Sequence, residues 1–154
     1  MSYIPPVVDR TSGDVSSRTA KAFFNLADWQ RIYNNAEVTK ALIDFLFETS
    51  ITFNAVAAPT VTTIPKVSDL NTLLANINRI LTASCLPALD GLNELREDWQ
   101  EGSATESPDY LDVNEWEAVL DLIYTSVGKS ADYFIHCGVA QTGQVRFYQN
   151  RFRS

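Results

Sequence analysis

A short pattern that occurs twice constrains the fold of this chain more than any other feature. Each copy begins with an apolar residue and continues with an Asn or Asp, two further residues, an acid and a tryptophan. The two copies are Phe24–Trp29 and Leu111–Trp116. The Asn or Asp side chain can accept hydrogen bonds from free N–H groups at a helix start, and the acid favours the positive helix end. The pattern therefore predicts helix caps at Asn25 and Asp112 with acids at Asp28 and Glu115.

The apolar residue in front of each cap completes the prediction. Phe24 is expected to staple onto Trp29, and Leu111 onto Trp116, which would bury both tryptophans in the core rather than leave them for contacts. A chain that uses its tryptophans at helix starts is building architecture. This use favours a structural or interaction protein.

Apolar residues at helical spacing extend the helical prediction along the chain. We expect helices over residues 11–22, 26–49, 68 to about 87, and from 113 to a C-cap at Gly128. Residues 51–64 are expected to form a long connection packed on the body, residues 91–100 a short helix or an ordered loop, and residues 101–108 a surface turn or linker. The residues expected to point inward are Trp29, Ile32, Tyr33, Ala36, Leu70, Leu73, Leu74, Ile77, Ile80, Leu81, Trp116, Val119, Leu120, Ile123 and Val127.

The two ends of the chain differ from the middle. Tyr3–Val8 contains Pro5 and Pro6, which predicts an extended segment lying along another surface. Residues 133–139 and 144–149 are strand-like runs on either side of a turn at 141–143, which predicts a β-hairpin. The predicted fold is mainly α, a small helical bundle of about four helices (residues 11–130) with an extended N-terminal arm (1–10) and a C-terminal β-hairpin with a basic tail (131–154).

Charge is distributed unevenly over the 154 residues. The net charge of −7 argues against general nucleic-acid binding through phosphates. Residues 90–121 hold many acids opposed only by Arg96, whereas beyond Asp132 the charged residues are Arg146, Arg151 and Arg153. This separation fits pairing between copies or with a neighbour, and it equally fits two solvated surfaces.

The sequence predicts no membrane insertion. It contains no apolar run near the roughly 20 residues that a spanning helix needs, and its first residues lack a basic region followed by an apolar one. We therefore expect a soluble protein made in the cytoplasm of the cell that produces it.

Residues with catalytic or metal-binding chemistry are few. Cys85 and Cys137 are far apart, and His136 is the only histidine, so we expect no metal and no cofactor. Asp109, Asp112 and Glu115 could be imagined as paired carboxylates, but acids at a helix start are ordinary capping groups. The chain is therefore predicted not to be an enzyme.

Several short motifs together resemble a known family. Asp9-Arg10-Thr11 with Asp14-Val15, followed by Lys21–Asn25 and Asp28–Asn35, is similar to a "DRTxxDV" opening and a "KGxxNxxDLNRIExN" helix in structural proteins of tailed phages and prophages of Firmicutes. Residues 112–120 resemble the second helix start of the same family, and residues 133–139 its short C-terminal β ending. Gln30 and Tyr33 differ from the usual Asn and Glu.

The resemblance implies a non-enzymatic virion protein of the tail or baseplate, located in the tail region of the particle. Its expected partners are other copies of itself and other tail or baseplate proteins. The residues expected to make assembly contacts are Tyr3, Ile4, Pro5, Pro6, Val7, Val8, Arg146, Phe147, Tyr148, Arg151 and Arg153.

One alternative function remains open. A host-surface or glycan-binding module of a phage particle would use exposed aromatic side chains. The candidates for that function are Tyr110, Tyr124, Tyr133, Phe147 and Tyr148.

Overall fold

Helices are the only regular secondary structure in the part of the chain that the structure describes. The computed structural model describes residues 1–22, 24–58, 60, 66–84, 94–102 and 107–136, with side chains in the last range as far as residue 129. Its elements are α1 (Ser12–Ser16), a 3₁₀ turn η1 (Ala20–Ala22), α2 (Leu26–Phe47), α3 (Val67–Ala83) and α4 (Tyr110–His136). The chain is thus mainly helical with four helices, and these residues contain no strand.

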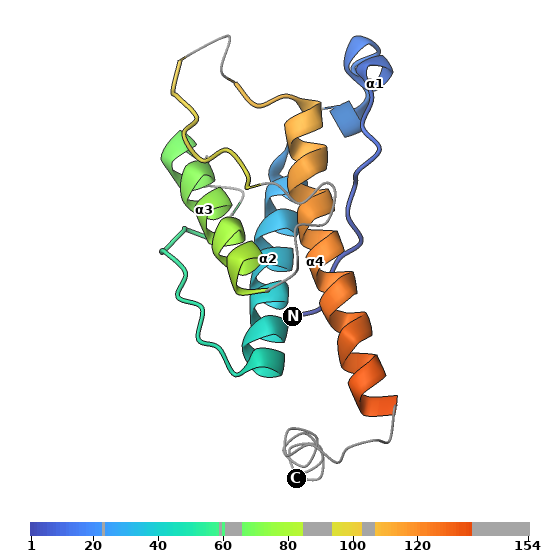
Figure 1. Cartoon of the computed structure of the whole chain (residues 1–154). Coiled ribbons are helices and arrows are strands. Elements are labelled where there is room, and N and C mark those ends of the chain that lie inside the picture. Colours follow the sequence, from blue (N-terminus) through green and yellow to red (C-terminus); the bar gives the residue numbers. More distant parts are fainter. Residues whose placement is uncertain (23, 59, 61–65, 85–93, 103–106, 137–154) are drawn as a thin grey trace.

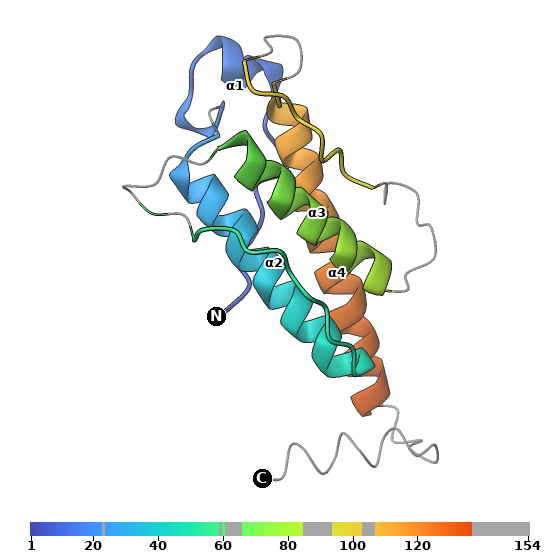
Figure 2. The same cartoon turned by 90° about the vertical axis from the view of Figure 1, so that its left-hand side faces the viewer.

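The three long helices run in the same direction, side by side (Figures 1 and 2). The described parts of the two connections between these helices, residues 48–58 and 94–102, lie along α3. In the first connection, Arg79 donates to the carbonyl of Thr52 while Asn76 bonds the backbone of Asn54, so this segment runs antiparallel to α3. In the second, Asn78 bonds Leu95 and Asn71 bonds Trp99, again antiparallel to α3.

The core lies between these helices and the second connection. Trp29 and Trp116 are each 2% exposed, as predicted, and the Trp99 ring meets Trp116 edge-on at 6.3 Å between ring centroids. The other buried apolar residues are Ile32, Ala36, Ile43, Leu70, Leu73, Leu74, Ile77, Ile80, Leu95, Val113, Val119, Leu120, Ile123 and Val127. Tyr33 and Leu81 are half-buried at its edge.

The predicted start of α2 is confirmed in detail. Asn25 accepts hydrogen bonds from the backbone N–H groups of Ala27 and Asp28, and Asp28 accepts one from the N–H of Asn25, which closes a capping box. The Phe24 ring packs edge-on against Trp29 at 6.0 Å between centroids. This staple fixes the angle at which the chain enters α2.

The predicted start of the last helix is wrong by one turn. The cap is Asp109 rather than Asp112, because Asp109 accepts from the N–H groups of Leu111 and Asp112, and Asp112 accepts from the N–H of Asp109. Leu111 therefore lies inside α4, where it is 58% exposed and holds no staple position. Both acid spacings fit the capping pattern, and the earlier start adds a helical turn that buries Val113.

Other helix boundaries also differ from the predicted ones: α2 ends at Phe47 rather than at residue 49 and α3 at Ala83 rather than at about residue 87, and the ends of α1 and α4 differ most. The first helix stops at Ser16, because Arg18 adopts a left-handed conformation (φ 51°), and η1 follows instead of a continuous helix to residue 22. At the other end α4 continues past Gly128 to His136. Glycine in a helix interior costs only about 1 kcal/mol relative to alanine, which the neighbouring turns outweigh.

The remaining predictions about the chain fall partly outside the described residues. Residues 51–58 form a connection without regular structure, as expected, and residues 94–100 are an ordered loop rather than a helix. Residues 133–136 of the first predicted strand belong to α4, whereas the rest of the predicted hairpin, 137–154, lies outside the described residues. Among the helices described, none is long and apolar enough to cross a membrane.

Candidate functional site

A buried cluster of four charged side chains joins the N-terminal residues to α2 and α4. Arg10 comes from the N-terminal segment, Asp28 and Arg31 from the first turns of α2, and Glu117 from the third turn of α4. Two positive and two negative charges make the cluster neutral. The Arg10 and Glu117 side chains are each 1% exposed, so the cluster is closed to solvent on that side.

Glu117 is the centre of the cluster. Arg31 binds it with two guanidinium hydrogen bonds of 2.7 Å each, Arg10 Nη2 donates at 2.9 Å, and the backbone N–H of Val7 donates at 2.8 Å. These four hydrogen bonds satisfy both carboxylate oxygens. A buried carboxylate is stable only with such compensation, because its removal from water costs several kcal/mol.

Asp28 serves two structures at once. Its Oδ2 closes the capping box of α2, while its Oδ1 accepts from Arg10 Nη2 at 2.8 Å and from Arg31 Nη2. The hydrogen bonds to Glu117, opposed by burial and supported by Asp28, raise the pKa of Arg31 above its ordinary value. Arg31 therefore stays charged at every pH at which a protein remains folded. The helix start predicted from the sequence is thus also one wall of the charge cluster.

Asparagine side chains hold the extended segments on the helices. Each of five asparagines accepts from the N–H and donates to the C=O of one residue, and the pairs are Asn35 with Ile4, Asn114 with Arg10, Asn76 with Asn54, Asn71 with Trp99 and Asn78 with Leu95. A segment lying on helices has no strand partner for its backbone polar groups. An amide side chain carries both a donor and an acceptor, so it replaces that partner.

The first ten residues lie along α2 and α4 through these contacts (Figure 1). The Tyr3 ring stacks on Tyr124 of α4 with 4.0 Å between centroids and an interplanar angle of 6°. Burial, and then the nearby carboxylate of Asp121, raises the pKa of the Tyr3 phenol above its usual range. Ile4 and Val8 instead face outward, 42% and 45% exposed. The segment therefore uses one side for its own helices and presents apolar side chains on the other.

The structure places the predicted contact residues in two groups. Tyr3–Val8 lies on the helices, with the backbone of Ile4 bound to Asn35 and that of Val7 bound to Glu117. Of the aromatic residues considered for glycan binding, Tyr124 is covered by Tyr3. The basic and aromatic contact residues at the other end, Arg146, Phe147, Tyr148, Arg151 and Arg153, lie outside the described residues.

Two of the three acids considered for catalysis have structural roles at the start of α4. Asp109 and Asp112 cap the helix through each other's backbone N–H groups, and Glu115 is exposed one turn further on. No group of three His, Cys, Asp or Glu side chains able to hold a metal ion occurs within the described part of the chain. His136 is the last residue of α4, and Cys85 and Cys137 lie outside the described residues.

Sequence patterns do not predict the cluster, although they carry one signal of it. Glu117 lies four residues after Val113 and three before Leu120, which puts a charge on the buried stripe of α4. Asp28 and Asn35 occupy equivalent positions on the stripe of α2. Polar residues at core positions need partners, and here the partners come from the N-terminal segment.

The chain was compared with known proteins in three ways. No protein-family model matches it, and neither a curated protein nor a solved structure is significantly similar to it.

Proposed function

We propose that this protein is a non-enzymatic structural component of a phage particle, in its tail or baseplate, where it joins copies of itself to neighbouring tail proteins. The proposal rests on the resemblance to structural proteins of Firmicutes phages and prophages. One observation in the structure supports the proposal: charged residues of the three motifs bind one another in the buried cluster that joins the N-terminal segment to α2 and α4. Arg10, Asp28 and Arg31 come from the first two motifs and Glu117 from the third, and they bind one another.

A buried charge cluster of this kind suits a structural protein, which must hold its contact surfaces in fixed positions. A buried charged network bound through specific hydrogen bonds fixes the register of the segment that joins it, whereas apolar packing tolerates sliding. The register of residues 2–10 on α2 and α4 is set at Ile4, Val7 and Arg10. A fixed N-terminal arm presents the same surface in every copy, which an ordered array requires.

The exposed apolar side chains support contacts at both ends of the molecule. Besides Ile4 and Val8, Val15 and Phe24 are 45% and 40% exposed near the helix starts, and Phe47 is 46% exposed at the end of α2. In the proposed arrangement the N-terminal arm and the basic C-terminal segment, residues 144–154, contact neighbours, and the helices hold them apart. The protein would be made in the host cytoplasm and end in the tail region of the virion.

Light scattering tests this function directly. The molar mass of the purified full chain is measured alone and after mixing with each candidate tail protein encoded beside it. We expect a multiple of 17.2 kDa, or a stable complex with a tail protein. A monomer that joins none of these proteins would overturn the proposal, and a chain without residues 144–154 that assembles unchanged would remove the basic tail as a connector.

A further inference from the structure

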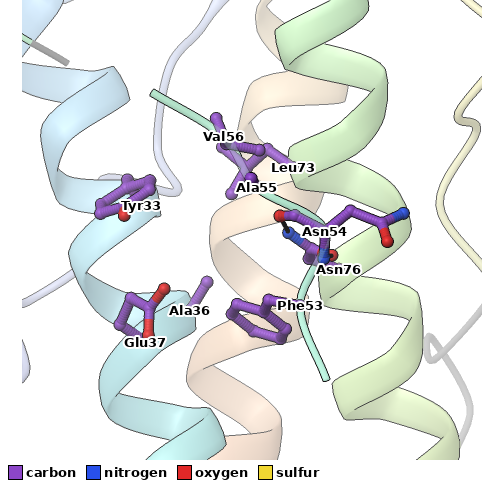
Figure 3. A pocket seen from close by; sticks show the side chains of 9 residues that line it. All are labelled: Tyr33, Ala36, Glu37, Phe53, Asn54, Ala55, Val56, Leu73 and Asn76. Atoms are coloured by element: carbon purple, nitrogen blue, oxygen red, sulfur yellow. Dashed lines mark hydrogen bonds between the residues drawn. The ribbon is translucent and has the colours of Figure 1, made fainter. Parts of the chain in front are cut away.

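A cavity of about 230 Å³ opens between α2, α3 and the connection that joins them (Figure 3). Tyr33 and Glu37 lie one turn apart on α2 and face Phe53 and Ala55 across it, with Ala36 between the two walls. Small-molecule sites usually measure about 300–1,000 Å³. This cavity is therefore sized for one long side chain rather than for a cofactor.

The wall formed by the connection is fixed before anything binds. Asn76 holds the backbone of Asn54 with two hydrogen bonds of 2.9 Å, and Arg79 donates to the carbonyl of Thr52 at 2.7 Å. Asp44 accepts from the N–H of Ile51 at 2.8 Å at the start of the same segment. A preformed cavity binds its occupant without the cost of ordering a loop.

The chemistry of the cavity selects a cation on an apolar stem. The Glu37 carboxylate makes no hydrogen bond or ion pair with another described residue, although Lys40, one turn away, is paired with Asp44. The Tyr33 and Phe53 rings line the same space, and ring faces attract cations. The Lys40 ammonium already lies over the Phe53 ring, 5.8 Å from its centroid, so a further cation would use the Tyr33 ring. An arginine side chain combines an aliphatic stem with a planar cation that binds carboxylates through paired hydrogen bonds.

We propose that this cavity receives an arginine side chain from the basic C-terminal segment, residues 144–154, of a second copy of this chain. The inference deepens the proposed function, on which it rests, by naming the partner and the contact. The segment carries Arg146, Arg151 and Arg153 and no acid, which complements both Glu37 and the net charge of −7. Residues 137–145 separate α4 from Arg146 and can span about 30 Å when extended.

The positions of the extended segments favour a second copy as the source of the arginine. Residues 2–10 bind α2 and α4, residues 51–56 cover α2 and α3, and residues 95–99 bind α3 beside the tryptophan of α4. These segments lie on the interhelical surfaces without filling the cavity. The cavity beside residues 53–56 remains open to a neighbour.

Sedimentation velocity on the full chain tests the inference. Glu37→Gln keeps the size of the side chain and removes the charge, and Ala55→Leu fills the mouth of the cavity. Each is expected to weaken self-association about tenfold or more, as is the triple variant Arg146→Gln/Arg151→Gln/Arg153→Gln. The matched control is Glu115→Gln, an exposed acid on α4, which should associate as the unaltered protein does.

Three results would overturn the inference. In the first, the unaltered protein does not self-associate; in the second, Glu37→Gln and Ala55→Leu leave association unchanged; in the third, Glu115→Gln weakens it as much as Glu37→Gln. Thermal unfolding of each variant separates lost binding from lost folding. A protein that binds tail proteins but not itself would contradict this inference alone and leave the proposed function standing.

Discussion

The change Glu117→Gln tests the buried charge cluster most severely. The substitution keeps the shape of the side chain but leaves two buried guanidinium groups facing one carboxylate, that of Asp28. Four hydrogen bonds to the Glu117 carboxylate are altered, from Val7, Arg10 and Arg31. Because the Arg10 side chain is 1% exposed, water cannot replace the lost partner.

Two estimates limit the expected loss in the free energy of unfolding of Glu117→Gln. Four hydrogen bonds to a charged group, at about 1.5–3 kcal/mol each, would together be comparable to the whole stability of many domains. The glutamine oxygen retains part of them, and removing one partner of a buried ion pair costs about 3–5 kcal/mol. We expect a loss in that range in the free energy of unfolding.

Urea denaturation followed by tryptophan fluorescence measures this loss, since Trp29 and Trp116 lie in the core. With a slope of about 2 kcal/mol per molar urea, the midpoint should fall by about 2 M. The control Glu115→Gln should move it by no more than about 0.25 M. A fall below about 0.5 M for Glu117→Gln would refute the account of the cluster.

A double variant separates charge imbalance from lost packing. Arg10→Met combined with Glu117→Gln leaves Asp28 and Arg31 to neutralise each other. The double variant should therefore lose at least about 1 kcal/mol less than the sum of the two single losses. Strict additivity would mean that Arg10 and Glu117 do not interact.

Three further predictions concern the N-terminal segment and the end of α2. Asn35→Leu should change the free energy of unfolding by no more than a few kcal/mol but speed amide exchange at Ile4 at least tenfold, because both backbone hydrogen bonds of Ile4 go to Asn35. Hydrogen exchange followed by NMR measures this rate. An unchanged rate would show that Asn35 does not hold the segment. Tyr3→Ala should cost about 2–4 kcal/mol in urea denaturation and Tyr3→Phe less than about 1, because the stack on Tyr124 needs the ring; equal losses would contradict a role for stacking. Burial acts to raise the pKa of Asp44, but hydrogen bonds from Lys40, Ile51 and Thr49 outweigh it and hold that pKa below its ordinary value. Its contribution is therefore present above about pH 4 and is lost as the pH falls through the folded pKa, so acid unfolding of Asp44→Asn should depend less on pH below 4 than that of the unaltered protein.

Local patterns were enough to predict the start of α2. The cap, the acid and the staple lie within six residues, Phe24–Trp29, and the contacts that close the capping box and the staple are made inside that window. The start of α4 was misplaced because Asp109 and Asp112 satisfy the same spacing as Asp112 and Glu115. The choice between the two depends on packing, since the earlier start buries Val113 and adds a turn beside the charge cluster.

Contacts between distant parts of the chain were beyond sequence reasoning. Arg10 meets Asp28 and Glu117, which are 18 and 107 residues away, and no periodic pattern links such positions. The asparagine pairs were missed for the same reason. The cavity beside Glu37 likewise depends on how residues 53–56 lie on the helices, because a stripe pattern does not specify the path of a connection.

The proposed function makes this chain a component of the virion. Its most direct test is quantitative mass spectrometry of phage particles, induced from the strain that encodes the chain and purified on a density gradient. If the chain is a tail component, we expect its peptides in the particle fraction at a fixed ratio to known tail proteins. Intact particles that contain those tail proteins but no peptide of this chain would contradict it.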